Sequence, residues 1–175
     1  MPINENIEFK PINIAVITVS DTRNEATDTS GQTLVELIEK SGHSVINKTI
    51  VKDDADKIID TIKSIIANTE VDAIISTGGT GLTGRDVTPE AIEKLCDKII
   101  PGFGELFRML SYEKIGTSTI QSRAIAGVYN GVYIFALPGS KGAVKDGWND
   151  ILQYQLDIRH TPCNFVEIMP RLNEK

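Results

Sequence analysis

Apolar and β-branched residues gather in short runs along the chain, at residues 13–20, 44–51, 71–76 and 132–137. In the runs 13–20 and 71–76 the apolar positions hardly alternate with polar ones, which is typical of strands buried on both faces of a parallel sheet. Asn130-Gly131 is a turn signal for a hairpin, and residues 118–128 predict a loop that leads into a strand near Ile125. The pattern therefore predicts several short strands, most of them buried.

The stretches between these runs carry apolar residues at helical spacing. Thr29 and Gln32 form a capping box for the first helix, and Gly42 ends it. Thr88-Pro89-Glu90 predicts another helix start, with a hydroxyl cap, a proline at the first position and an acid in the first turn. Pro101-Gly102 breaks the chain before a later helix. Further helices are predicted over residues 55–68, 105–114 and 143–156.

Alternation of strands and helices predicts βαβ units with right-handed crossovers. The 175 residues suit one domain. We therefore expect a single α/β domain, a doubly wound and mostly parallel sheet flanked by helices, over residues 13–158. Residues 1–12 form an N-terminal segment, and residues 159–175, which lack periodicity, are expected to be an extended tail that packs on a neighbouring subunit.

Composition and charge exclude some classes of function. Hydrophobic residues make up 41% and charged residues 24% of the chain, as in ordinary globular proteins. The net charge of −6 and the scattered lysines and arginines argue against a nucleic-acid partner. The first ten residues carry no signal-peptide pattern, and no apolar run approaches the roughly 18 residues of a membrane span. We expect a cytoplasmic protein with no membrane partner.

The residue types that build zinc sites and hydrolase triads are sparse. His43 and His160 lie on different predicted elements and are expected to be surface or packing residues rather than metal ligands. Cys96 and Cys163 form no CxxC pair, so free buried thiols are expected. Neither GxSxG nor GxxxxGK[ST] occurs in the sequence. Trp148 is expected in the core or at an interface.

Ligands of doubly wound domains bind beyond the carboxyl ends of the strands. The glycine-rich loop 77–84 follows a predicted strand there, and its backbone amides and threonine hydroxyls are suited to a phosphate group. A tight turn without a ligand is the alternative. Gly79-x-Gly81-x-x-Gly84 also matches the dinucleotide-binding motif, but the next helix starts near Thr88 rather than at the third glycine. Leu137-Pro138-Gly139-Ser140 predicts a second anion site at a helix start.

Two acidic residues follow neighbouring strands at this edge, Asp53 and Asp86. A pair of carboxylates beside phosphate-binding amides suits Mg²⁺, which binds one or two carboxylates together with phosphate oxygens. From the residues alone a structural explanation is equally good: Asp53 caps a helix, and Asp86 forms an ion pair with Arg85.

The combination of these loops resembles the MoaB/MogA family of molybdenum cofactor biosynthesis. The resemblance rests on four motifs in order, and it extends over nearly the whole chain: Thr77-Gly-Gly-Thr-Gly81, Arg85-Asp-Val-Thr-Pro-Glu-Ala91, Pro101-Gly-Phe-Gly104 and Leu137-Pro-Gly139. The stretch Arg159-His-Thr-Pro-Cys-Asn-Phe165 is more similar to the MoaB branch than to MogA. The resemblance implies the molybdopterin-binding, MogA-like fold, assembled as a homo-oligomer, a trimer or a hexamer.

The resemblance also implies a function. Active members bind molybdopterin, a pterin dithiolene with a terminal phosphate, and transfer AMP from Mg·ATP to that phosphate. It makes Asp53 and Asp86 the critical acids and Mg²⁺ ligands. The ligand-binding positions that it implies are Ser20, Asp21, Gly78, Gly79, Thr80, Gly81, Thr88, Glu90, Pro138, Gly139 and Ser140. ATP and Mg²⁺ enter as co-substrate, and no tightly bound metal is expected. A molybdopterin carrier without catalysis, and less favourably a dinucleotide-dependent oxidoreductase, are the alternatives.

Overall fold

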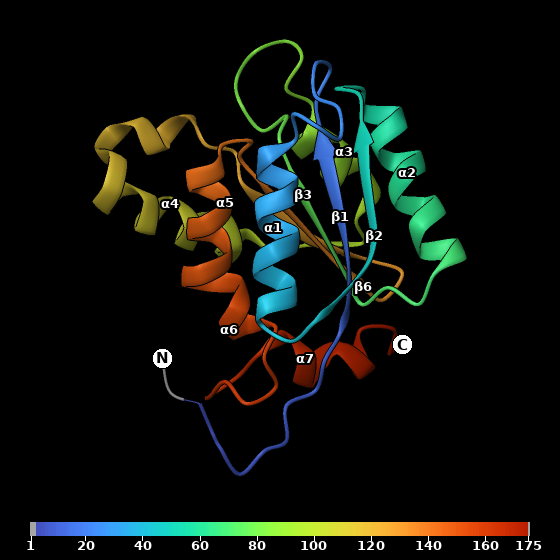
Figure 1. Ribbon diagram of the computed structural model, residues 1–175, viewed down its shortest axis with the longest axis vertical. Helices are drawn as coiled ribbons and strands as arrows, with labels where there is room; N and C mark the ends of the chain where they lie inside the picture. Colours follow the sequence, from blue (N-terminus) through green and yellow to red (C-terminus); the bar gives the residue numbers. More distant parts are fainter. Residues whose placement is uncertain (1–2, 175) are drawn as a thin grey trace.

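A computed structural model describes residues 3–174 and contains one six-stranded sheet with the order β2-β1-β3-β6-β5-β4. The first four strands in that order are parallel, whereas β5 runs antiparallel to both of its neighbours. Figure 1 shows the strands running side by side through the centre of the molecule. Their bounds are β1 Asn13–Val19, β2 Ser44–Val51, β3 Ala73–Thr77, β4 Lys98–Ile99, β5 Ile125–Tyr129 and β6 Val132–Leu137.

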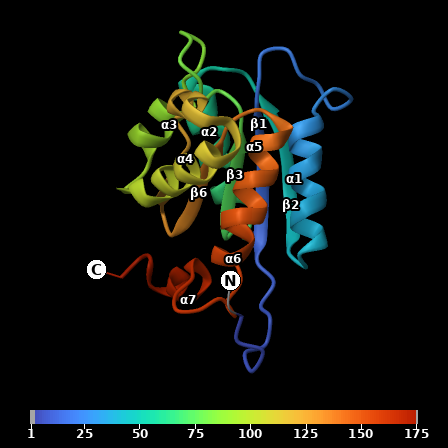
Figure 2. The same cartoon turned by 90° about the vertical axis from the view of Figure 1, so that its left-hand side faces the viewer.

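Helices cover both faces of this sheet (Figures 1 and 2). The core on one face contains side chains of α1 (Thr29–Lys40), α4 (Pro101–Ile115) and α5 (Lys141–Gly147), and the core on the other face contains those of α2 (Ala55–Asn68) and α3 (Thr88–Leu95). The short elements are η1 Gly116–Gln121, η2 Trp148–Leu152, α6 Gln153–Gln155, α7 Phe165–Ile168 and η3 Met169–Arg171. The doubly wound α/β fold predicted from the sequence is confirmed.

The central strands lie between these two cores, which explains their continuous apolar runs. In β1, Ile14 and Val16 pack on the α1 side while Ala15 and Ile17 pack on the α2 side. Because successive side chains of a strand point to opposite faces, a strand with a core on each side needs apolar residues at every position. The edge strand β2 lies at the end of the sheet and is only partly buried.

The structure corrects two predicted helix caps. The N-cap of α1 is Asp28, whose carboxylate accepts a hydrogen bond from the Gly31 amide, so the Thr29–Gln32 capping box does not form. The Thr88 hydroxyl does not cap α3 either, because it donates to the Gly78 carbonyl. At both helix starts, hydrogen bonds with other segments of the chain determine which side chains cap the helix and which do not.

Two predicted boundaries also differ. Pro101 does not break the chain before a helix but occupies the first turn of α4, where its missing N–H costs no hydrogen bond. The last helical stretch starts at Lys141 rather than 143, and a π-helical turn, η2, interrupts it. The strand near Ile125 and the hairpin at Asn130-Gly131 are confirmed; both turn residues have positive φ, 49° and 79°.

The C-terminal segment folds back on its own chain and contains the helix α7, which corrects the expectation of an extended tail. Its contact with a neighbouring subunit stays a prediction. Val166 is 1% exposed and belongs to the same core as α1 and α5. The ring of Phe165 lies 4.8 Å from that of Tyr133, whose hydroxyl donates to the Phe165 carbonyl. Periodicity cannot reveal such a segment, because a helix of one turn is too short to show a period.

Trp148 and both histidines are buried packing residues, in agreement with the sequence. The cysteines are free as predicted, but Cys163 is exposed and Cys96 only half-buried. Burial raises the pKa of the Cys96 thiol to about 12. In residues 3–174 no helix has the length and apolar character that crossing a bilayer requires.

Candidate functional site

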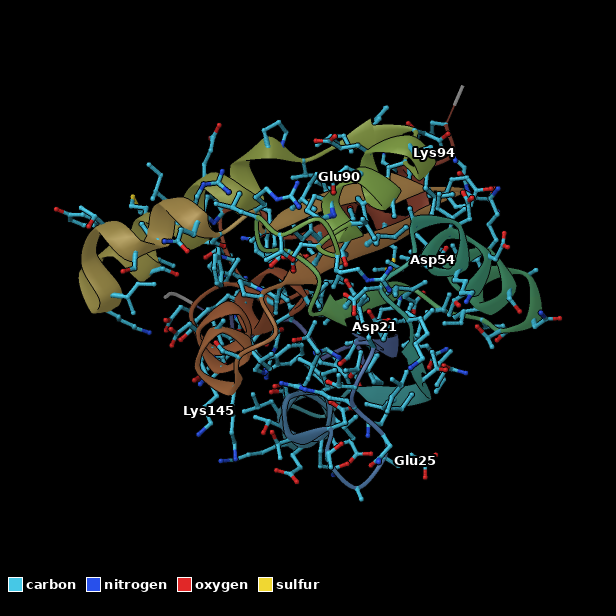
Figure 3. All side chains as sticks on the ribbon, turned by 90° about the horizontal axis from the view of Figure 1, so that it is seen from above. Asp21, Glu25, Asp54, Glu90, Lys94 and Lys145 are labelled. Atoms are coloured by element: carbon cyan, nitrogen blue, oxygen red, sulfur yellow. The ribbon has the colours of Figure 1, made fainter. Side chains whose placement is uncertain are left out.

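Loops from the carboxyl ends of β1, β3 and β6 surround a cavity of about 590 Å³, walled on its other side by α4 and η1. The edge of the sheet that carries these loops is seen from above in Figure 3. Asp86, one of the two predicted catalytic acids, lines it, as do most of the predicted ligand-binding positions: Ser20, Gly78, Gly79, Thr80, Gly81, Pro138, Gly139 and Ser140. The fold therefore brings together residues that lie more than a hundred positions apart in the chain.

Two glycines of the loop after β3 are required by its backbone. Gly78 has φ +105° and Gly79 has φ +64°, conformations that side chains disfavour. A Cβ atom on Gly78 would lie 2.2 Å from the Val19 carbonyl oxygen, and one on Gly79 would lie 2.4 Å from the Thr88 hydroxyl. The Thr88 hydroxyl also donates to the Gly78 carbonyl over 3.0 Å. Thr88 is thus a buried support of the loop and does not line the cavity.

Asp53 follows β2 and is half-buried beside this loop. The carboxylate that caps α2 is that of Asp54, which accepts from the Lys57 amide, so the capping role considered for Asp53 is wrong. A Cβ on Gly79 would lie 3.1 Å from Asp53 Oδ1, which places this carboxylate against the glycine loop. Burial raises the pKa of Asp53 above its usual range, and repulsion from the Asp21 and Asp86 carboxylates adds to the rise.

Asp86 is held by its own loop and not by Arg85. Its Oδ2 accepts from the Thr83 amide over 2.8 Å and from the Thr83 hydroxyl over 2.6 Å, and the hydroxyl lowers the pKa of Asp86. Arg85 instead donates to Asp21 Oδ2, over 2.9 Å from Nε and 2.6 Å from Nη2. The ion pair considered between Arg85 and Asp86 is therefore absent, and Arg85 neutralises Asp21.

Arg123, in the segment after η1, fixes the loop that carries Asp86. Its Nε donates to the Gly81 carbonyl over 2.8 Å and its Nη2 to the Asp86 carbonyl over 2.7 Å. Its Nη1 pairs with Glu90, so Glu90 orients Arg123 and does not line the cavity. One guanidinium thus binds two carbonyls that the glycine-rich loop leaves without helix or strand partners. Nothing in the sequence around Arg123 indicated this role.

The second predicted anion loop, Pro138 to Ser140, is anchored through its Gly139 carbonyl. That oxygen accepts from the Ser30 hydroxyl over 2.8 Å and from Arg23 Nη2 over 3.0 Å. The Ser140 hydroxyl accepts from the Ala143 amide and caps α5. Because Arg23 also lines the cavity, this loop brings a positive charge to the cavity wall.

The cavity wall contributed by α4 was missed by the sequence analysis. Phe107, Ser111 and Ile115, spaced four residues apart along α4, face the cavity, and η1 adds Ser118 and Gln121. Opposite them, Asp146 of α5 also lines it, and its carboxylate accepts from Lys114 of α4 over 2.7 Å. The four-residue spacing was visible in the sequence, but it is also typical of a helix facing a solid core.

The donor set of Asp53 and Asp86 fits a magnesium ion that also binds phosphate oxygens of a ligand. Asp53, after β2, and Asp86, in the loop after β3, supply carboxylate oxygens beside Gly79 and Gly81, although β1 lies between these two strands in the sheet. Mg²⁺ binds proteins through one or two carboxylates together with substrate oxygens. Burial is the main cause of the raised pKa of Asp53, and a cation bound beside Asp53 would offset both this burial and the smaller repulsion from Asp21 and Asp86. Among residues 3–174 no group of three or more His, Cys, Asp or Glu side chains is placed to hold a metal ion by itself.

The parallel sheet and the glycine-lined cavity at its carboxyl edge define a ligand-binding domain of the doubly wound α/β class. Residues 15–158 match the family described as a probable molybdopterin binding domain. The chain belongs to the MoaB/MogA family of molybdenum cofactor biosynthesis proteins, and its relatives place it in the MoaB branch.

Three relatives illustrate this membership. Molybdenum cofactor biosynthesis protein B of Escherichia coli strain K12 is 50% identical over 158 residues, 90% of this chain and 93% of that protein. A crystal structure of a molybdenum cofactor biosynthesis protein B superposes with a TM-score of 0.85 at 42% identity, covering 95% of this chain and 98% of the other. The crystal structure of the tungsten cofactor synthesizing protein MoaB from Pyrococcus furiosus superposes with a TM-score of 0.78 at 35% identity. It covers 94% of this chain and 99% of the other.

Proposed function

We propose that this protein binds molybdopterin and transfers AMP from ATP to the terminal phosphate of the pterin. One observation supports the proposal above the others: two carboxylates, Asp53 and Asp86, lie against the glycine loop that lines a cavity large enough for a pterin. This arrangement combines backbone amides that can bind a phosphate group with carboxylates that can bind a cation on the nucleotide.

Each part of the site has a task in this reaction. The amides of the Gly78–Gly81 loop hold the pterin phosphate, and Arg23 adds a positive charge beside it. An oxygen of that phosphate attacks the α-phosphorus of ATP, the bond between the α-phosphorus and the bridging oxygen breaks, and pyrophosphate leaves. Asp53 and Asp86 would hold a magnesium ion, which would neutralise charge on the phosphates when bound. Arg123 keeps the Asp86 loop in place, and positioning of this kind is the main contribution of a protein to phosphoryl-type transfer.

Incubation of the purified protein with molybdopterin, ATP and magnesium tests the proposal. We expect the adenylylated pterin to accumulate with one pyrophosphate per product, both detected by mass spectrometry and a pyrophosphate assay. Bound pterin that stays unmodified at every magnesium concentration would contradict the transfer step.

A carrier that binds molybdopterin without transferring AMP is the second candidate. The hydrogen bonds of Asp86 favour this carrier. Both the amide and the hydroxyl of Thr83 donate to Asp86 Oδ2, so this oxygen has fewer lone pairs free to bind a metal ion. The same incubation separates the two functions. The dinucleotide-dependent alternative fits the loop less well, since α3 begins at Thr88, four residues beyond Gly84.

We infer that Asp146 recognises the pterin ring. It lies five residues after Lys141, the first residue of α5, about 7.5 Å along the helix axis, so it lines the cavity at a distance from the Pro138–Ser140 loop. The pyrimidine ring of a pterin presents adjacent N–H donors, and a carboxylate accepts two such bonds at once. We expect Asp146→Asn to weaken binding of a 6-substituted pterin phosphate about tenfold. Binding of the corresponding lumazine, which has an oxo group in place of the 2-amino group, should stay unchanged.

Asp150→Asn is the matched control for that variant. Asp150 pairs with the same Lys114 nitrogen over 2.7 Å but does not line the cavity. It should leave the preference for pterin over lumazine intact in fluorescence titrations. An equal loss of preference in both variants would show that the Lys114 ion pairs, and not the Asp146 carboxylate, set the specificity.

We also propose assembly into trimers or hexamers, as the resemblance implies. Support comes from large apolar side chains on the outer surface of α4 and η1, where Met109 is 60%, Tyr112 58% and Ile120 80% exposed. Apolar residues gathered in this way are typical of protein–protein contacts. Residence in the cytoplasm stays a prediction from the sequence.

A further inference from the structure

A second cavity, of about 750 Å³, lies along the C-terminal half of β2 and beside the loop after β1. Three cationic side chains line it, Arg23, Lys48 and Lys52. No step described above uses the two lysines. Figure 3, seen from above this edge, shows Asp21 near the centre of the loops and Glu25 at the outer end of the same loop.

The positive charges of this cavity exceed the negative charges around them. Arg23 and Lys48 share one carboxylate, that of Asp28, at 3.6 and 3.3 Å. Burial acts to raise the pKa of Asp28, but hydrogen bonds from Gly31, Thr18 and Lys48 outweigh it and lower the pKa, so Asp28 is a fixed anion under the cavity floor.

Within residues 3–174, Lys52 pairs with no carboxylate. Its Nζ donates to the Asp21 carbonyl over 2.5 Å, while the Asp21 carboxylate is taken by Arg85. The acid that lines the cavity is Glu25, which is exposed at its rim. The three cations Arg23, Lys48 and Lys52 thus face two carboxylates, those of Asp28 and Glu25, which leaves a net charge of +1. These cationic side chains also have N–H donors that are free to bind a ligand.

The cavity adjoins the candidate active site. Ser20 and Arg23 line both cavities, so they form a common wall. Lys52 immediately precedes Asp53, and the Asp53 amide donates to Asp21 Oδ1 over 3.3 Å. A chain of phosphates with one end at Asp53 and Asp86 would thus pass from the first cavity into a second one that carries positive charge.

We propose that this second cavity binds a diphosphate group: the β- and γ-phosphates of the nucleotide before transfer and the pyrophosphate after it. The proposal rests on the proposed function for its place in the reaction, but the site is defined by its own cations. Lys48 and Lys52 contact the non-bridging oxygens, and Arg23 lies at the boundary, where the bond to the leaving group breaks. Neutralising the leaving pyrophosphate favours transfer, because charge builds up on it as that bond breaks.

Binding of inorganic pyrophosphate, measured by calorimetry with the full chain and without any pterin, tests the site directly. We expect Lys48→Gln/Lys52→Gln to weaken binding at least tenfold. Lys40→Gln/Lys63→Gln is the matched control, since it removes the same charge from exposed positions on α1 and α2, and it should bind within twofold of the wild type. Lys52→Gln alone should show part of the loss, and it leaves the partners of buried Asp28 untouched.

The outcomes separate this proposal from the proposed function. Equal weakening in the cavity and control variants, or none in either, overturns the diphosphate site even if AMP transfer is observed. Lysine-dependent pyrophosphate binding in a protein that makes no adenylylated pterin supports the site and refutes the transfer. Where transfer occurs, the KM for ATP should rise in Lys52→Gln while the KM for the pterin stays constant.

Discussion

Replacement of Asp86 by asparagine is expected to lower AMP transfer by about a hundredfold to a thousandfold, the usual cost of removing one pre-organised electrostatic contact. The asparagine oxygen can still accept from the Thr83 amide, which the aspartate does over 2.8 Å, so the loop should keep its conformation. What the variant lacks is the negative charge that, together with Asp53, would hold magnesium. Pterin affinity should therefore change little, and titration of the bound pterin by fluorescence measures it.

Asp56→Asn is the control for this variant. Asp56 is an exposed carboxylate of α2, and it pairs with Lys94 over 3.0 Å outside the site. It should retain wild-type transfer and melting temperature. Unchanged turnover in Asp86→Asn would remove Asp86 from the catalytic machinery, whereas a parallel loss of pterin binding would assign it to the binding loop alone.

The main features of the fold were readable in the sequence because they depend on local patterns. The apolar runs of β1 and β3 follow from a sheet with a core on each side, and each of these strands is followed by a helix with regular apolar spacing. Parallel strands end at a common edge, so the loops with Gly78, Asp53 and Gly139 could be assigned to one side of the molecule before any coordinates were known.

The remainder depends on contacts that no local pattern encodes. Arg123 binds carbonyls about forty residues away, and its neighbours in the chain give no sign of this partner. Asp28 caps α1 in place of the predicted Thr29, and its carboxylate is held by the Thr18 hydroxyl and Lys48, which come from other segments of the chain. The tail folds back because Val166 and Phe165 meet Tyr133, a contact between distant segments.

The glycine loop adds a stability requirement to the chemistry. The Gly78 backbone has φ +105°, and the Val19 carbonyl, 2.2 Å from where a Cβ would lie, belongs to the central strand β1 and cannot retreat. The same close approach keeps the amides of the loop beside the cavity. Stability and ligand binding therefore depend on the absence of a single side chain.

Gly78→Ala should therefore destabilise the protein by about 3 kcal/mol, through a strained backbone and a steric clash. For a chain of this length that corresponds to a fall in melting temperature of about 6 to 12 °C, measured by calorimetry. Gly84→Ala, in the same loop but with open space around its Cβ, should stay within about 0.5 kcal/mol of the wild type. If Gly78→Ala proved as stable as Gly84→Ala, the loop would be able to move away from β1. The rigid backbone amides that the proposed reaction needs to bind a phosphate would then not exist.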